Sequence, residues 1–228
     1  MAVFKLFLTS FNIFELTWNP DIINIMKKVL CFGDSNTYGF NPINGTRYAK
    51  SERWSGILQG LTKGDFQIVE AGCNNRTAFS ENPAGKMMTG IKILPECLTD
   101  NFDIVIIAVG INDLQFSYDV KISDYEIGIE RLINIVKEKL PNAKIILLSP
   151  SEISENILNG FFANLFDEKS IEKSKLLSSI YEKIANKNNC EILDLNKIAT
   201  PSKIDGLHYE IEEHNKIANC MFKLLKKF

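Results

Sequence analysis

The sequence predicts an α/β fold, a flavodoxin-like three-layer α/β/α sandwich with a five-stranded parallel sheet, and two features of the chain support this. Five short runs rich in Val and Ile are apolar at successive positions, as in strands that are buried on both faces. Segments with helical patterning separate these runs. Because strands that alternate with helices form parallel sheets, we expect the sheet to lie between two helical layers.

The expected strands recur along most of the chain. They are residues 29–32, 67–69, 104–109, 145–148 and 191–195. The expected helices are residues 51–62, 89–99, 123–140, 168–187 and 210–226. No repeat or low-complexity linker divides this series, so a single domain is expected.

The helix at residues 123–140 has the clearest sequence signals. Ser123 is a residue type that caps the start of a helix, and Pro141 marks the end. The apolar positions follow helical spacing, and they are Ile127, Ile129, Leu132, Ile133, Val136 and Leu140.

Composition narrows the class of protein. The chain has 228 residues, of which 45% are hydrophobic, and this suffices for one globular domain with a sizeable core. A net charge of -2 and scattered Lys and Arg residues argue against nucleic-acid binding. Five cysteines without Cys-x-x-Cys or Cys/His ligand spacing indicate neither a disulfide framework nor a metal site. We therefore expect a reduced, cytoplasmic protein that uses no cofactor.

The first 25 residues are expected to lie outside the core domain, which then spans residues 26–228. Residues 1–11 superficially resemble a signal sequence, but they contain one Lys and no small-residue cleavage pattern. No stretch is long enough to span a bilayer, so no membrane partner is expected. Met26 directly precedes the first strand. The extension is either an upstream start-codon artefact or a real appendage.

Loops with glycine and polar residues are expected to gather at one edge of the sheet. They are residues 33–35, 71–74, 110–113 and 205–208. Open α/β sheets bind ligands beyond the carboxyl ends of their strands. The topology therefore predicts one site made from residues that are far apart in the sequence.

Three residues in these loops fit the chemistry of a serine hydrolase. Ser35 supplies a hydroxyl group, His208 an imidazole that takes its proton, and Asp205 a carboxylate that fixes the tautomer and stabilises the imidazolium. Attack on an ester carbonyl also requires donors for the developing oxyanion. The candidates are the backbone N–H groups of Ser35 and Gly72 and the side-chain amide of Asn112.

These loops resemble the four sequence blocks of the SGNH (GDSL-type) esterase family, over a match that runs from about Lys28 to the C-terminus. The blocks read Gly33-Asp34-Ser35, Gly72, Gly110-x-Asn112-Asp113 and Asp205-x-x-His208. Arg53-Trp54-Ser-Gly56 and Glu70-Ala-Gly-Cys-Asn-Asn-Arg-Thr77 are similar to the small-acyl arylesterase and acyltransferase branch. This resemblance implies a small ester substrate with a short acyl chain, and a homo-oligomer. Asn36 replaces the leucine of the family's name motif, at a position that is not catalytic.

Residues in or near these blocks are candidates for substrate contact or for structural roles. Tyr38, Trp54, Cys73 and Arg76 are expected to contact the substrate, although each could instead serve in packing or in subunit contacts. Asp34 and Asp113 are expected to be structural carboxylates that bind loop N–H groups, and His214 is expected to lie on the surface.

Two functions from other classes stay open. A strand-to-helix turn with glycine can cradle a phosphate, which would make the chain a flavodoxin-like phosphate or nucleotide-binding module without hydrolase activity. No Gly-x-Gly-x-x-Gly or Walker lysine occurs there. The chain could also be a catalytically inactive interaction protein. Among esterase functions, the sequence does not separate hydrolysis from acyl transfer to an alcohol.

Overall fold

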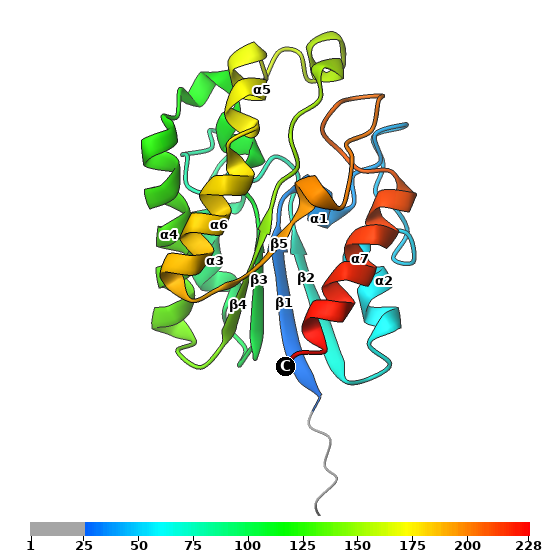
Figure 1. Ribbon diagram of the computed structural model, residues 1–228, viewed down its shortest axis with the longest axis vertical. Coiled ribbons are helices and arrows are strands. Elements are labelled where there is room, and N and C mark those ends of the chain that lie inside the picture. The colour runs from blue at the N-terminus through cyan, green and yellow to red at the C-terminus, as the bar shows by residue number, and fades with distance from the viewer. Residues whose placement is uncertain (1–25) are drawn as a thin grey trace, which may run out of the picture.

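The structure, a computed structural model, describes residues 26–228 and has a parallel sheet between two layers of helices (Figure 1). The strands are β1 (Lys27–Gly33), β2 (Phe66–Gly72), β3 (Ile104–Ala108), β4 (Lys144–Ser149) and β5 (Glu191–Asp194). All pairings are parallel, in the order β2-β1-β3-β4-β5. The expected fold is confirmed, whereas the expected extension at residues 1–25 lies outside the described residues.

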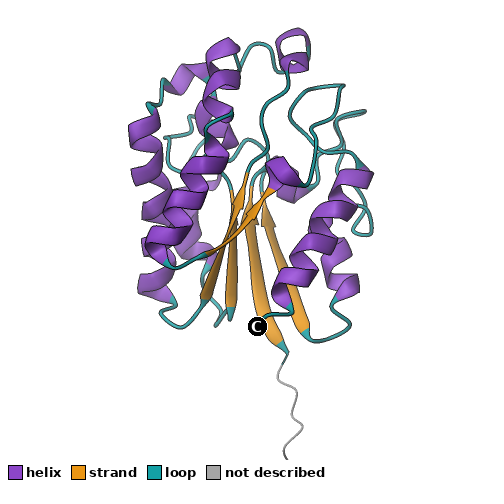
Figure 2. Ribbon diagram, in the orientation of Figure 1, coloured by secondary structure: helices purple, strands orange, loops and turns teal. Residues whose placement is uncertain are grey.

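Helices connect successive strands (Figure 2). They are α1 (Ser35–Tyr38), α2 (Trp54–Leu61), α3 (Gly90–Cys97), α4 (Ile122–Lys139), α5 (Glu168–Ser174), α6 (Leu177–Asn188) and α7 (Ile211–Leu225). Short 3-10 helices occur in the loops: η1 (Lys86–Met88), η2 (Ile111–Leu114), η3 (Phe116–Tyr118), η4 (Glu155–Asn159) and η5 (Leu195–Lys197).

The two helical layers cover opposite faces of the sheet (Figure 1). On one face α2 packs beside α7, and on the other α4 packs between α3 and α6. In β1, Leu30 and Phe32 point into the core under α3 and α4, while Val29 and Cys31 point into the core under α2 and α7. Because successive strand residues point to opposite faces, burial of both faces accounts for the unbroken apolar runs.

The start of α4 differs from the expectation. The helix begins at Ile122, with Lys121 at the capping position and no side-chain hydrogen bond there. Ser123 lies inside the first turn, where its hydroxyl donates to Asp124 at 3.3 Å. The expected end agrees with the structure, because the helix stops one residue before Leu140 and Pro141 follows.

In residues 26–228, no helix combines the length and apolar character needed to cross a bilayer.

The single helix expected at residues 168–187 is two helices, α5 and α6. Asp167 and Ser170 form a capping box at the start of α5. At its end, the Ser174 hydroxyl donates to the carbonyl of Ile171 at 2.7 Å and accepts the N–H of Ile153 at 2.9 Å. Serine hydroxyls that bond backbone groups compete with the helix, so this contact with a neighbouring loop accounts for the break.

His214 is fully buried, so the expectation that it lies on the surface is wrong. It lies on the face of α7 that also carries Ile217 and Met221, which packs against α2. Its Nδ1 accepts the backbone N–H of Trp54, the first residue of α2, at 3.3 Å. The residue at the capping position of α2, Arg53, makes no side-chain capping bond to this helix. His214, which lies on a different helix, therefore accepts an N–H group that would otherwise be free at the start of α2.

The burial of His214 predicts an acid-sensitive fold. Burial disfavours the imidazolium and lowers the pKa of His214 to about 3. Between roughly pH 6.5 and 3 the unfolded chain binds this proton and the folded chain does not, so the free energy of unfolding falls as pH falls, by up to about 1.4 kcal/mol per pH unit.

His214→Asn removes the titration but keeps an oxygen that can accept the Trp54 N–H. Urea unfolding from pH 6.5 to 4 should show a steeper loss of stability in the wild type than in this variant. Parallel pH dependences would contradict the burial of His214.

Candidate active site

The loops at the carboxyl edge of the sheet bring together residues from distant parts of the chain (Figure 1). Ser35 is the first residue of α1, directly after β1 and the capping residue Asp34. Asn112 lies in η2, which follows β3. Asp205 and His208 lie in the loop between η5 and α7. Ser35 and His208 are 173 positions apart and are in contact.

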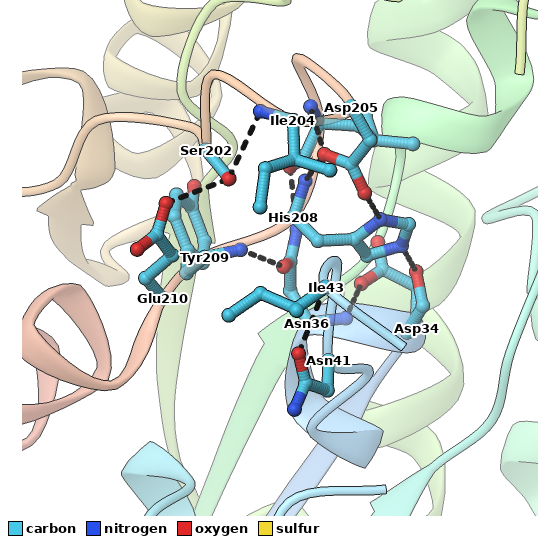
Figure 3. Close-up of polar contacts among 12 residues, drawn as sticks. Asp34, Asn36, Asn41, Ile43, Ser202, Ile204, Asp205, His208, Tyr209 and Glu210 are labelled. Atoms are coloured by element: carbon cyan, nitrogen blue, oxygen red, sulfur yellow. Dashed lines mark hydrogen bonds and ion pairs between the residues drawn. The ribbon is translucent and has the colours of Figure 1, made fainter. Parts of the chain in front are cut away.

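Asp205, His208 and Ser35 form a continuous line of hydrogen bonds. His208 Nδ1 lies 2.7 Å from Asp205 Oδ2, a contact drawn in Figure 3. On the other side of the ring, His208 Nε2 lies 2.8 Å from Ser35 Oγ. All three residues are buried. Phe40 and Phe162 pack on the imidazole, with ring centroids 4.3 and 5.2 Å away, and they limit its rotation.

The partners of Asp205 set its charge and the tautomer of the imidazole. Its other oxygen, Oδ1, accepts the backbone N–H groups of Leu207 and His208, each at 2.9 Å. Burial alone would raise the pKa of Asp205, but the side-chain hydrogen bond with His208 and these backbone bonds hold it below its usual value. An ionised Asp205 accepts Nδ1–H, which leaves Nε2 free to accept a proton from Ser35.

The loop that carries Asp205 and His208 is closed by backbone hydrogen bonds. The N–H of Ser202 donates to the carbonyl of His208 at 2.7 Å, and the N–H of Gly206 donates to the carbonyl of Ser202 at 2.8 Å. Gly206 has a φ of 73°, and a Cβ there would lie 2.6 Å from the nitrogen of Ile157. Only glycine fits this turn, which sets the spacing between the carboxylate and the imidazole.

Asp34 and Asp113 bind loop N–H groups, as expected from the sequence. Asp34 accepts the N–H of Asn36 at 3.0 Å and caps α1. Burial raises the pKa of Asp34 to about 7. Asp113 accepts three consecutive backbone N–H groups, from Ala78 to Ser80, at 2.5 to 3.1 Å. These carboxylates shape the loops that surround Ser35.

A cavity of about 240 Å³ opens beside the Ser35 hydroxyl. Its polar wall holds three asparagines, Asn74, Asn75 and Asn112, while the rest of the wall is largely apolar. The lining residues are Ser35, Phe40, Asn74, Asn75, Asn112, Phe162, Leu165, Phe166, Leu207 and His208. A carbonyl group placed here would lie next to the Ser35 hydroxyl and to amide donors.

Gly72, expected as an oxyanion donor, does not line this cavity. The next residue, Cys73, donates its N–H to the carbonyl of Gly33 in β1. Because successive N–H groups of a strand point in opposite directions, the Gly72 N–H points away from β1. Gly72 instead allows close packing on α1, since a Cβ would lie 2.2 Å from the nitrogen of Tyr38. The residues of this loop that line the cavity are Asn74 and Asn75, and Asn75 has a φ of 57°.

Comparison with known families agrees with this geometry. Residues 31–211 match the model of the GDSL-like lipase/acylhydrolase family, which is more than half of the chain. The chain belongs to this family. The resemblance seen in the four sequence blocks is thereby confirmed, and membership of the family places the chain among the carboxylic ester hydrolases. No curated protein matches the sequence.

Solved structures of esterases share the whole fold. A carbohydrate acetylesterase family member from Sinorhizobium meliloti is 27% identical, with a TM-score of 0.82 over 89% of this chain and 98% of that chain. The aryl esterase of M. smegmatis is 26% identical, with a TM-score of 0.82 over 88% of this chain and 99% of that chain. Within the GDSL-like family, this chain is therefore an SGNH hydrolase of the arylesterase branch.

Asn36, which replaces the leucine of the GDSL motif, connects α1 to the histidine loop. Its Nδ2 donates to the carbonyl of Leu207, and its Oδ1 accepts the N–H of Tyr209, both at 3.3 Å (Figure 3). These two bonds flank His208 in the sequence. The departure from the GDSL motif thus adds a link between the helix that carries Ser35 and the loop that carries its partner.

The four residues expected to contact substrate do not line the cavity. Trp54 lies in the core under α2, where only 1% of it is exposed. The Arg76 guanidinium donates to the carbonyls of Gly33, Ala71 and Met87, so it holds the loop after β2. The Tyr38 ring packs under the guanidinium of Arg47 at 4.4 Å. Cys73 is also absent from the cavity wall, and its N–H extends the pairing with β1.

Sequence reasoning missed most of the apolar wall. Phe162, Leu165 and Phe166 come from the loop between β4 and α5, which has no periodic pattern and no family block. Phe40 lies five residues after Ser35, and this closeness to the first sequence block is a signal that places it near the site. Asn75 was also within reach of sequence reasoning, because asparagine is enriched at positive φ in loops.

Proposed function

We propose that this chain hydrolyses short-chain carboxylic esters through an acyl-enzyme intermediate on Ser35. The observation that carries the proposal is the line of hydrogen bonds from Asp205 through His208 to Ser35, which ends at the cavity wall. A phosphate-binding module would have no use for this buried pair of a carboxylate and an imidazole behind a serine hydroxyl. Family membership points in the same direction.

The proposed reaction has two halves. Ser35 Oγ attacks the ester carbonyl while His208 Nε2 takes the hydroxyl proton, and Asp205 stabilises the imidazolium. The oxyanion is stabilised by the N–H groups of Ser35 and Asn75 and by the Nδ2–H of Asn112. His208 then protonates the leaving alcohol as the C–O bond breaks. In the second half His208 activates a water molecule, whose attack on the acyl carbon releases the acid and restores Ser35.

The size of the cavity supports a short acyl chain. Its volume of about 240 Å³ is below the roughly 300 to 1,000 Å³ of pockets that enclose drug-sized ligands. Three of the apolar residues that line it, Phe162, Leu165 and Phe166, are large. An acetyl group with a small alcohol fits these limits. A long acyl chain would need an open path past these side chains.

A series of p-nitrophenyl esters from acetyl to palmitoyl tests the proposal. We expect kcat/KM to be highest for acetyl or propionyl esters and to decrease by at least about tenfold toward octanoyl, because extra methylenes must displace the side chains of the wall, and overpacking of this kind costs roughly 1 to 3 kcal/mol. Equal rates along the series would contradict the short-chain assignment. Absence of turnover with every ester would contradict the esterase itself.

Other expectations from the sequence remain proposals. Acyl transfer to an added alcohol should compete with hydrolysis, because a largely apolar wall excludes water. A homo-oligomer is supported by the exposed apolar side chains of Ile43, Phe161 and Ile204, which surround a second hollow next to Phe40. A cytoplasmic location without nucleic-acid or membrane partners is proposed from composition alone.

A further inference from the structure

Gln115 binds two asparagines of the active-site cavity from behind. It directly follows η2, is buried and does not line the cavity. Its Nε2 donates to Asn75 Oδ1 at 2.7 Å and to Asn112 Oδ1 at 3.2 Å. The two N–H groups of the Gln115 amide thus bind Asn75 and Asn112, the two residues that supply proposed oxyanion donors.

The contact with Gln115 fixes the orientation of the Asn112 amide. Asn112 Oδ1 faces the Gln115 donor, and Asn112 Nδ2 donates to the carbonyl of Arg76 at 3.1 Å. A reversed amide would place two donors together at Gln115 and two acceptors together at Arg76. The remaining Nδ2–H of Asn112 is therefore available to an oxyanion. Arg76 is itself held by its guanidinium bonds to neighbouring carbonyls.

The same amide restrains Asn75. This residue has a φ of 57°, a backbone conformation that is uncommon for residues other than glycine. The bond from Gln115 at 2.7 Å holds its side chain, and with it the direction of its backbone N–H. Movement of Gln115 would therefore disturb two oxyanion donors together, although it touches neither the substrate nor Ser35.

We propose that Gln115 is a positioning residue that aligns Asn75 and Asn112 for stabilisation of the oxyanion. The proposal rests on the proposed esterase function. It assigns Gln115 an effect on the transition state, because the oxyanion forms only there and ground-state binding of the ester does not require alignment of these donors.

The test is a double-mutant cycle on p-nitrophenyl acetate, with Gln115→Met and Asn112→Ala. Rates are divided by the fraction of Ser35 that a fluorophosphonate labels, so that misfolded enzyme does not count. Asn112→Ala should lower kcat about 100- to 1000-fold, and Gln115→Met about 10- to 100-fold with KM within about threefold. In the Asn112→Ala background, the effect of Gln115→Met should be at least about threefold smaller, because one of its two targets is gone.

Gln59→Met serves as the matched control. Like Gln115, Gln59 uses its side-chain amide in hydrogen bonds, but its partners are backbone groups: it accepts the N–H of Ile68 and donates to the carbonyl of Phe66. It lies on α2 and does not line the cavity. Its kcat per labelled site should stay within about twofold of wild type.

The outcomes separate the two proposals. A kcat of Gln115→Met within about threefold of wild type, or an undiminished effect in the Asn112→Ala background, would overturn the positioning role and leave the esterase intact. Gln115→Glu keeps the shape but removes both donors, and it should repeat the loss of Gln115→Met. If the wild type neither reacts with the probe at Ser35 nor turns over esters, the proposed function itself fails.

Discussion

Ser35→Ala is expected to lower kcat for p-nitrophenyl acetate by about 10⁴- to 10⁶-fold, because the variant has no oxygen that can form the acyl intermediate. The fold should be unaffected, since the Ser35 hydroxyl contacts His208 and supports no other element. Circular dichroism and thermal unfolding check this second point. The small remaining rate would come from binding and from the oxyanion donors.

Ser123→Ala is the control for the loss of a hydroxyl group. Ser123 is exposed on α4 and does not line the cavity, so the turnover of this variant should equal that of wild type. If Ser35→Ala kept more than about a tenth of wild-type kcat, the nucleophile would lie elsewhere and the proposed mechanism would be wrong.

Asp205→Asn is expected to reduce the plateau of kcat/KM by about 10⁴-fold at neutral pH. The carboxylate, whose pKa the His208 hydrogen bond helps to hold below its usual value, accepts Nδ1–H from the ring. An asparagine can donate to Nδ1 instead, which moves the proton to Nε2 and prevents acceptance of the Ser35 proton.

The pH profile of kcat/KM from pH 4 to 9 measures this plateau, with Asp124→Asn as the control. Asp124 is an exposed carboxylate in the first turn of α4, and its replacement should leave the plateau unchanged. A plateau for Asp205→Asn within about tenfold of wild type would show that Asp205 does not set the tautomer.

The contact among Ser35, His208 and Asp205 can be predicted from the sequence because each residue lies in a short block at a strand end. Ser35 directly follows a recognisable buried strand, and Asp205 and His208 are three residues apart around a glycine turn that their spacing already indicates. The topology of a parallel sheet then brings the blocks to one edge. Neither inference needs knowledge of side-chain packing.

The sequence predicts the pocket poorly because neighbours in the chain point in different directions. Arg76 adjoins Asn75, yet its side chain turns back to bind strand carbonyls while Asn75 faces the cavity. Gly72 fits a family block, but it does not line the cavity, and the alternation of N–H groups along β2 directs its donor away from β1. His214 looks like a surface residue until α2 is placed against α7. These differences depend on tertiary packing, which local patterns do not encode.

The most direct test of the proposed mechanism is the site of covalent labelling by a fluorophosphonate, located by peptide mass spectrometry. We expect one adduct, on Ser35, and we expect it to form in step with the loss of ester turnover. Labelling should be strongly slowed in His208→Ala, because this variant lacks the base that activates the hydroxyl. An adduct on any other residue that accompanies inactivation, or full activity after complete labelling of Ser35, would contradict it.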